Sequence, residues 1–336
     1  MSDTPQHAEI KTLHLTEPFR IAHGVSTERQ VLRLRWGGAI GEAPFVPYYG
    51  EDPQETLRWV RSLAWQGGPA PSDGPRAGRL ALDVLCNDAM GKERHEPLWN
   101  LWDLDCSKLP PACRSFSIPT DLDAFAEKVR ETHRQYRVLK LKLGSGNAEL
   151  DEAIAARARE AAPRATLFAD ANGGWSVETA TVLLPRLARH GLAFVEQPIH
   201  HSGGVEAWRE LRKALPQCPL PLYADESTQN ADDAIALEGL VEGVNVKLLK
   251  CCSFAEARRM IDTARKLNQR VLLGCMIESS IGVTAAAHLA PLADLVDLDG
   301  HLYLSDDDYE GVRFGENGEV LLPEGAGLGV RERGME

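Results

Sequence analysis

The sequence predicts an α/β fold, a (β/α) barrel with an additional α+β lobe, and three observations support it. Five charged residues, each at the end of a short apolar run, follow one another at intervals of 22 to 29 residues, and a sixth lies about two such intervals further on. The interval is about one strand, one loop and one helix long. The chain of 336 residues also has room for a barrel of about 250 residues and a further layer.

The first 111 residues do not follow the barrel interval. VLRLRW (31–36) alternates apolar and polar residues, as an antiparallel strand does, and GGAIGEAP (37–44) supplies turn residues after it. From Pro75 to Trp102 the apolar residues recur at three- and four-residue steps, which predicts a helix. Strands followed by a helix indicate a separate α+β lobe.

Eight apolar runs then predict the strands of the barrel: 113–119, 138–144, 166–171, 192–198, 221–227, 243–249, 270–276 and 295–299. The helices between them have start signals. Ser253 and Glu256 form a capping-box pattern, and Ser176 is a good N-cap. Pro185 is expected to kink or shorten the helix that Ser176 begins.

The last segment, from 301 to 336, is rich in turns and short strands. We expect it to leave the barrel and pack on the first lobe. The predicted division is therefore 1–111 for the α+β lobe, 112–300 for the barrel and 301–336 for the returning segment.

Composition excludes several classes of protein. The hydrophobic fraction of 43% and the charged fraction of 26% are typical of globular proteins, and no apolar run reaches the roughly 20 residues of a membrane span. A formal charge of −12 without a basic stripe argues against a nucleic acid partner. Seven cysteines without CxxC spacing, and an amino terminus unlike a signal peptide, indicate a cytoplasmic protein with reduced thiols.

Three of the charged strand ends are carboxylates from consecutive strands: Asp170, Glu196 and Asp225. The carboxyl ends of barrel strands converge on one mouth, so these side chains are expected to lie together. Three oxygen ligands with open positions suit Mg²⁺, and the lack of histidine or cysteine at these strand ends argues against zinc. Any one of them alone could be an acidic side chain in solvent. Three carboxylates at the same position of consecutive strands are not explained in that way.

Lysines flank this trio in the predicted barrel. Strand alternation puts Lys140 and Lys142 on one face, with three leucines on the other, so both lysines are expected inside the barrel. Lys247, from the sixth strand, would face Lys142 across the metal. In this arrangement one lysine removes a proton α to a metal-bound carboxylate, and the other returns a proton to the opposite face. Crowded cations should lower the lysine pKa values towards neutrality.

At these residues the chain resembles the enolase superfamily, in its muconate-lactonising-enzyme-like subgroup. The resemblance spans nearly the whole chain, through GEAP, the helix 81–102, KLK, DANGGW, EQP, DES and NVKLLK. It implies a modified TIM barrel, (β/α)7β, with a capping domain built from the N-terminal region and the C-terminal tail. It also implies Mg²⁺-assisted proton abstraction through an enediolate, with Asp170, Glu196 and Asp225 as metal ligands and with Lys142 and Lys247 as acid and base.

Within the subgroup the chain is most similar to the dipeptide epimerases, which invert the α-carbon of the C-terminal residue of a dipeptide. The mark of that family is Asp-x-Asp at the eighth strand, matched by Asp297 and Asp299, which would bind the substrate's ammonium group. The resemblance further implies that Lys140 contacts the substrate carboxylate, that Met276, in GCMIES, contacts the substrate, and that the protein is a homo-oligomer.

Two departures from the family concern the substrate. Cys251 and Cys252 stand where relatives have two glycines, which would change the loop and the room for the substrate's first residue. His23 stands where some relatives have an arginine for a glutamate side chain, which weakens the case for an acidic second residue. Glu51 and Asp52 could instead favour a cationic dipeptide. The preferred dipeptide stays open at this point.

Other functions remain as alternatives. An N-acylamino acid racemase, an o-succinylbenzoate synthase or a cycloisomerase would share the fold and the metal, but their substrates have no free ammonium group for Asp297 and Asp299. A catalytically silent binding protein on the same scaffold is the alternative outside enzymes, and the complete set of catalytic positions argues against it. The sequence does not identify the physiological pathway.

Overall fold

The computed structural model describes residues 7–63 and 68–334, and its centre is an eight-stranded parallel sheet. The strands follow one another in space in chain order: β4 (Cys113–Phe116), β5 (Val138–Lys142), β6 (Thr166–Asp170), β7 (Leu192–Glu196), β8 (Leu222–Ala224), β9 (Gly243–Lys247), β10 (Arg270–Gly274) and β11 (Leu295–Asp297). A parallel bridge between Ala112 and Val296 joins the first strand to the last. The eight predicted strands and their barrel arrangement are confirmed.

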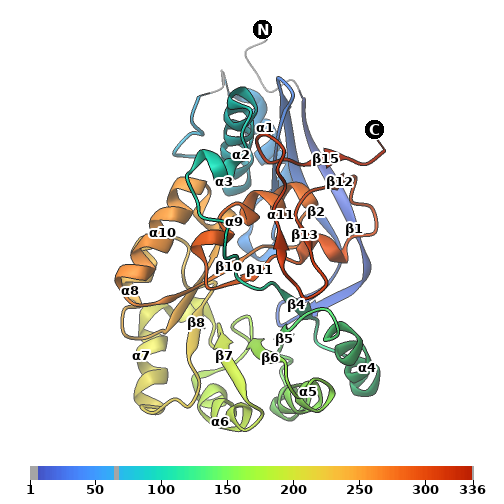
Figure 1. Cartoon of the computed structure of the whole chain (residues 1–336). Helices are drawn as coiled ribbons and strands as arrows, with labels where there is room; N and C mark the ends of the chain where they lie inside the picture. The colour runs from blue at the N-terminus through green and yellow to red at the C-terminus, as the bar shows by residue number, and fades with distance from the viewer. Residues whose placement is uncertain (1–6, 64–67, 335–336) are drawn as a thin grey trace.

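Helices cover the outside of this barrel (Figure 1). They are α4 (Leu122–Thr132), α5 (Ala148–Ala161), α6 (Val177–Ala188), α7 (Gly204–Ala214), α8 (Ala231–Ala236), α9 (Leu248–Cys251), α10 (Phe254–Lys266) and α11 (Ser280–Ala287). Each barrel strand from β4 to β10 is followed by an α-helix, and no α-helix follows β11 in the described part of the chain. The expected (β/α)7β pattern is therefore confirmed.

The predicted helix starts are correct. The Ser253 side chain accepts a hydrogen bond from the backbone N–H of Glu256, and that of Ser176 accepts one from Thr179. Both bonds satisfy an N–H group that has no partner inside the helix. Helix α6 continues past Pro185 to Ala188, so the expected shortening at that proline does not occur.

An antiparallel sheet of β1 (His7–Ile21), β2 (Gly24–Trp36) and β3 (Ala39–Pro44) begins the chain. The segment 37–44 supplies the expected turn only at Gly37 and Gly38, which have positive φ, and its remaining residues form the fully buried strand β3. A Cβ atom on Gly41 would lie 2.1 Å from the carbonyl oxygen of Ala81. This glycine therefore allows close packing of β3 on a helix and does not mark a turn.

Helices α1 (Pro53–Ser62) and α2 (Arg76–Arg94) pack on this sheet, and the short α3 (Leu98–Leu101) packs on α2. The helix expected over 75–102 is thus divided, because His95 takes a left-handed conformation and Pro97 lies just after it. In the described residues no helix has the combined length and apolar character that crossing a membrane requires.

The C-terminal segment forms short strands: β12 (Tyr309–Glu310), β13 (Arg313–Phe314), β14 (Val320–Leu321) and β15 (Arg331–Glu332). It lies beside the N-terminal sheet (Figure 1). Arg33 of β2 donates a 2.8 Å hydrogen bond to Asp308, and the backbone N–H of Leu328 donates one to Asp88 of α2. These bonds link the C-terminal segment to the N-terminal lobe. The domain limits at 111 and 300 stay a prediction.

Side chains of alternate residues fill the barrel interior. Phe194 of β7 stacks on Phe168 of β6 and on Tyr223, with ring centroids 4.4 and 4.0 Å apart. Residues i and i+2 of a strand share a face. The side chains two positions further along these three strands therefore stand directly above the aromatic layer, and all three are carboxylates: Asp170, Glu196 and Asp225.

Candidate active site

Three carboxylates meet at the carboxyl end of the barrel. Asp170 ends β6, Glu196 ends β7 and Asp225 follows β8, and one carboxylate oxygen of each lies within 4.8 Å of the others. Asp170 and Glu196 are direct register partners, so backbone pairing sets their common level. All three are buried. The structure thus brings together the residues that the sequence placed at one mouth.

The chemistry of this trio suits a hard divalent cation. It offers only carboxylate oxygens, which Mg²⁺ prefers, and no histidine or cysteine belongs to the described group. Burial raises the pKa of Glu196 to about 8, with a further contribution from the negative charge of Asp170. Three carboxylates held this close repel one another, and a cation among them would relieve the repulsion.

Two lysines stand at the two ends of the trio. Lys142, at the end of β5, donates a 2.6 Å hydrogen bond to Asp170. Lys247, at the end of β9, donates a 2.7 Å hydrogen bond to Asp225. Because β5 and β9 are four strands apart in a ring of eight, the two amines approach the carboxylates from opposite sides.

Lys140 lies deeper than these two lysines. Its Nζ is 3.0 Å from an oxygen of Asp170, 2.8 Å from Glu196 and 2.6 Å from Asp297, and only 1% of the residue is exposed. The ring of Phe168 lies below it, at 5.7 Å. Lys140 therefore joins the trio to the end of β11.

The carboxylates act on the pKa values of Lys247 and Lys140 in the opposite direction to the lowering expected from crowded cations. Burial lowers the pKa of Lys247, but the carboxylates of Asp225 and Glu196 outweigh it, so the pKa lies well above its ordinary value. Burial and the surrounding carboxylates act on Lys140 in the same way. The lowering expected with a metal cation among these carboxylates stays a prediction.

Three further residues hold the trio, and sequence reasoning did not assign them. Lys250 donates a 2.7 Å hydrogen bond to the side chain of Asp225, Asn245 donates a 2.6 Å bond to Glu196, and the backbone N–H of Asn172 donates to Asp170. All three lie inside the motifs DANGGW and NVKLLK. Asn245 could have been found by alternation, since it shares a strand face with Lys247.

The two aspartates of the eighth strand have different partners. Asp297 accepts hydrogen bonds from Lys140 and from Ser115 Oγ, at 2.6 and 3.0 Å. One oxygen of Asp299 accepts from the backbone N–H of Ser115 at 2.7 Å, from the Tyr303 hydroxyl at 2.9 Å and from Arg114 at 3.2 Å. These donors hold both carboxylates in place.

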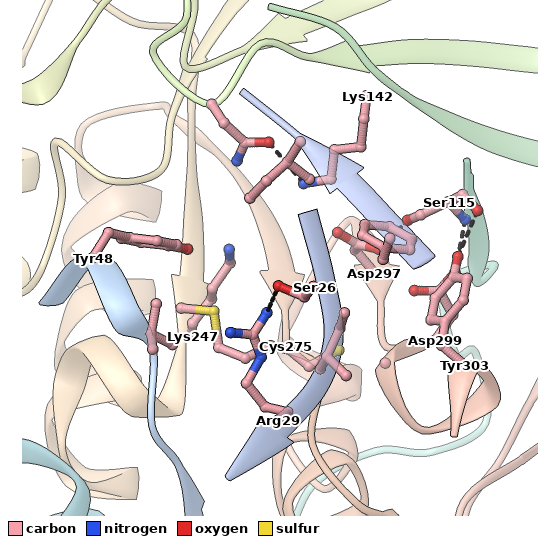
Figure 2. Close-up of a pocket in the computed structure, with 17 residues that line it drawn as sticks. Ser26, Arg29, Tyr48, Ser115, Lys142, Lys247, Cys275, Asp297, Asp299 and Tyr303 are labelled. Carbon is pink, nitrogen blue, oxygen red and sulfur yellow. Dashed lines mark hydrogen bonds between the residues drawn. The ribbon is translucent and has the colours of Figure 1, made fainter. Parts of the chain in front are cut away.

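Above these groups is a cavity that is partly open to solvent (Figure 2). It is lined by residues of the β1–β2 hairpin, of the segment after β3 and of the carboxyl ends of the barrel strands: Phe19, Ile21, Ser26, Arg29, Val46, Tyr48, Ser115, Lys142, Asn172, Lys247, Cys275, Met276, Ile277, Asp297, Asp299, Gly300 and Tyr303. Figure 2 shows Lys142 and Lys247 entering it from different strands. The trio and Lys140 lie beneath the lining.

Only some of the residues predicted to bind the substrate lie at the cavity. Met276, Asp297 and Asp299 line the cavity, whereas His23 does not. His23 lies in the turn between β1 and β2, with its ring 4.6 Å from that of Tyr48 and its Nε2 3.8 Å from Glu226.

The residues suggested for a cationic substrate have other partners. Asp52 caps α1 by accepting from the backbone N–H of Glu55, and Glu51 accepts from Ala77 at the start of α2. Neither lines the cavity, so this interpretation is wrong. Cys251 and Cys252 are buried outside the cavity lining as well, which removes their expected effect on the substrate's first residue.

Comparisons with known proteins agree with this geometry. Residues 122–333 match the family model described as Enolase C-terminal domain-like. The chain is 33% identical to the L-Ala-D/L-Glu epimerase of Bacteroides thetaiotaomicron, over 96% of this chain and 85% of the relative. It is 35% identical to the hydrophobic dipeptide epimerase of Roseobacter litoralis, over 96% and 97%. This chain belongs to the dipeptide epimerase family of the enolase superfamily.

Solved structures agree with the family assignment. The dipeptide epimerase from Cytophaga hutchinsonii, solved with Mg and D-Ala-L-Val, superposes with a TM-score of 0.87 at 27% identity and covers 97% of this chain and 95% of its own. The resemblance inferred from the sequence motifs is confirmed. As a member of a family of epimerases, the chain is an enzyme of the isomerase class.

Proposed function

We propose that this chain is a Mg²⁺-dependent dipeptide epimerase that inverts the α-carbon of the C-terminal residue by proton transfer between two lysines. One observation carries the proposal: Lys142 and Lys247 reach one cavity from opposite sides of the barrel, on either side of the acidic trio. Two bases on opposite faces of one carbon are what inversion of that carbon requires.

Asp170, Glu196 and Asp225 would hold the metal, because they are the described carboxylates close enough together to share one ion. Bound Mg²⁺ supplies positive charge to the substrate carboxylate and so makes the adjacent C–H more acidic. The related structure from Cytophaga hutchinsonii contains Mg and a dipeptide, which supports both the ion and the substrate class.

The lysines then act in turn on the α-carbon. One free amine takes the α-proton from one face and leaves an enediolate, and the ammonium group of the other delivers a proton to the opposite face. Lys140, below the trio, supplies a further positive charge near the substrate carboxylate. Asn172, which donates to Asp170, and Lys250, which donates to Asp225, keep the carboxylates in position.

Asp297 and Asp299 would bind the ammonium group of the dipeptide. Both carboxylates line the cavity, and a pair of carboxylates is a good match for one ammonium group. This pair favours a dipeptide over the substrates of an N-acylamino acid racemase, an o-succinylbenzoate synthase or a cycloisomerase. It also opposes a silent binding protein, since every group needed for proton transfer is present.

Incubation in D₂O with Mg²⁺ tests the proposal. L,L- and L,D-dipeptides and N-succinyl amino acids are offered separately, and mass spectrometry follows deuterium at the α-carbon. We expect incorporation into dipeptides and a change of configuration at the second residue. Incorporation only into N-succinyl amino acids would support the racemase instead, and no incorporation into any compound would support a binding protein. Two further properties remain predictions: a cytoplasmic location and a homo-oligomeric state. Light scattering will measure the oligomeric state.

A further inference from the structure

Arg29 is a cavity residue that the predicted site does not include. It lies on β2, and its side chain lines the same cavity as Lys142, Lys247, Asp297 and Asp299. Figure 2 shows its guanidinium in the pocket, with Tyr48 and Lys247 on one side and Asp299 and Tyr303 on the other. The hairpin of β1 and β2 thus contributes a cation to a pocket otherwise formed at the barrel mouth.

Within residues 7–63 and 68–334, no carboxylate forms an ion pair with this guanidinium. The guanidinium donates a 2.8 Å hydrogen bond to the neutral hydroxyl of Ser26. Burial lowers the pKa of Arg29, which means that the pocket does not compensate for the loss of water. Arg29 is half-buried, so its charge loses part of its hydration without gaining a counter-ion, and an anionic ligand would relieve that cost.

The negatively and positively charged side chains that line the cavity come from different parts of the chain. Asp297 and Asp299 lie together at the end of β11, whereas Arg29, Lys142 and Lys247 come from other elements. A dipeptide bound by its ammonium group at the two aspartates places its carboxylate at the metal. The side chain of its second residue is then the part left to contact the hairpin.

We propose that Arg29, supported by Ser26, binds a carboxylate in the side chain of the dipeptide's second residue, so that the preferred substrates end in glutamate or aspartate. This inference rests on the proposed function for the orientation of the dipeptide. It reverses the interpretation of His23: the turn lacks an arginine, but strand β2 provides one six residues later. Arg29 can hold a carboxylate with two parallel N–H groups.

The first measurement compares L-Ala-L-Glu with its neutral isostere L-Ala-L-Gln, and then with L-Ala-L-Leu and L-Ala-L-Lys. Hydrogen bonds between charged groups add about 1.5–3 kcal/mol, which is roughly 10- to 100-fold in kcat/KM for glutamate over glutamine. In Arg29→Gln this ratio falls to about one, and in Arg29→Glu the order of glutamate and lysine reverses. Arg20→Gln, which removes an exposed arginine of β1 outside the cavity lining, is the matched control and keeps the wild-type ratio.

Equal kcat/KM for the glutamate and glutamine dipeptides in the wild type would overturn the inference. An Arg29→Gln variant in which kcat/KM falls equally for both dipeptides would also overturn it, since Arg29 would then bind the main-chain carboxylate. Calorimetric binding of the same pair to the Mg²⁺-loaded protein separates this inference from the proposed function. A preference for glutamate that depends on Arg29, without deuterium exchange, would keep the subsite and reject the epimerase.

Discussion

At the scale of single residues, strand alternation connects packing with chemistry. The aromatic layer of Phe168, Phe194 and Tyr223 is stacked inside the barrel, and each ring is followed two positions later by a carboxylate of the trio. A shift of one residue in any of these strands would turn the carboxylate out of the barrel. The rigid aromatic floor therefore fixes the height of the three acidic side chains.

Asp299→Asn tests the ammonium site. Asparagine keeps the size of the side chain and can still accept from Ser115 and Tyr303, but it removes the negative charge. We expect kcat/KM for dipeptides to fall roughly 10- to 100-fold, mainly through KM, because a charge-assisted bond to the substrate is lost. Asp306→Asn, an exposed residue paired with His14, is the control. Unchanged kinetics in Asp299→Asn would contradict the role of this residue.

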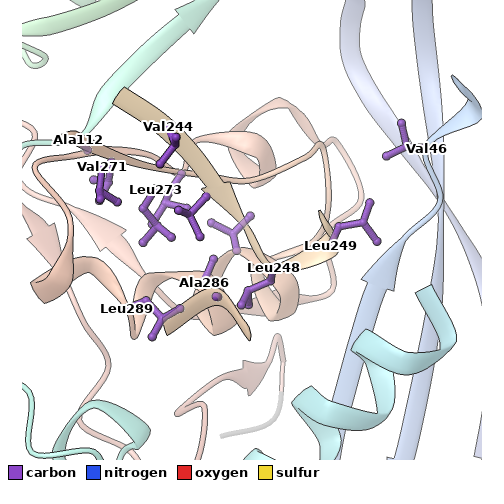
Figure 3. Packing of buried hydrophobic residues seen from close by; sticks show 14 of the residues in the cluster. Val46, Ala112, Val244, Leu248, Leu249, Val271, Leu273, Ala286 and Leu289 are labelled. Carbon is purple, nitrogen blue, oxygen red and sulfur yellow. The ribbon is translucent and has the colours of Figure 1, made fainter. Parts of the chain in front are cut away.

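At the scale of elements, β10 connects the two sides of the site. Gly274 at its end is the register partner of both Lys247 on β9 and Asp297 on β11. Just before it, Leu273 is fully buried with Val244 and Val271 and with Ala286 of α11 (Figure 3). The position of Lys247 relative to Asp297 thus depends on the packing of one strand.

Leu273→Ala will test this dependence. Removing a buried leucine costs the transfer free energy and leaves a cavity, so we expect the free energy of unfolding to fall by about 3 kcal/mol. Leu321→Ala changes a leucine that is 44% exposed and should cost less than about 1 kcal/mol. Urea denaturation measures both values. Equal losses in the two variants would show that the core around β10 is not packed as described.

At the scale of the whole molecule, His288 links three parts of the chain. It follows α11, contacts the backbone N–H of Trp99 in the N-terminal lobe at 3.3 Å, and lies 3.1 Å from the carbonyl oxygen of Leu328 in the C-terminal segment. Burial lowers the pKa of His288 to about 4. The imidazole therefore stays neutral in the folded protein while it titrates near 6.5 in the unfolded chain.

This difference predicts how stability depends on pH. Between pH 6.5 and 4 the unfolded state binds a proton at His288 that the folded state does not, so stability falls as the pH falls. From pH 7 to pH 5 the wild type should lose about 2 kcal/mol more than His288→Gln, whose side chain does not titrate. Urea midpoints at the two pH values measure the loss. Parallel pH profiles would contradict a buried neutral histidine.

Metal binding also affects the stability of the whole fold, because an ion that binds the folded protein but not the unfolded chain stabilises the folded state. Mg²⁺ at about 100 times its dissociation constant should add about 2.7 kcal/mol, seen as a rise in Tm that EDTA reverses. Asp225→Asn, although less stable because Lys247 and Lys250 lose their partner, should show no such rise. A rise in Asp225→Asn equal to that of the wild type would place the ion elsewhere.

The barrel and the acidic trio could be predicted from the sequence because each depends on a short-range pattern. An apolar run with a charge at its end is visible in five or six residues, and barrel topology then brings the charges together. β3 was missed because Gly41, needed for packing on α2, looked like a turn residue. Arg29 was missed for a different reason: its place in the cavity depends on how the β1–β2 hairpin meets the barrel, and no local pattern encodes that.

The most direct test of two-lysine catalysis is α-proton exchange in D₂O, followed by NMR for each isomer of a dipeptide separately. Wild-type protein should label both isomers and interconvert them. Lys142→Ala and Lys247→Ala should each abolish interconversion and label at most one isomer, a different one for each variant, because each lysine serves one face. Exchange of both isomers by either single variant, or continued epimerisation by the double variant, would contradict the account.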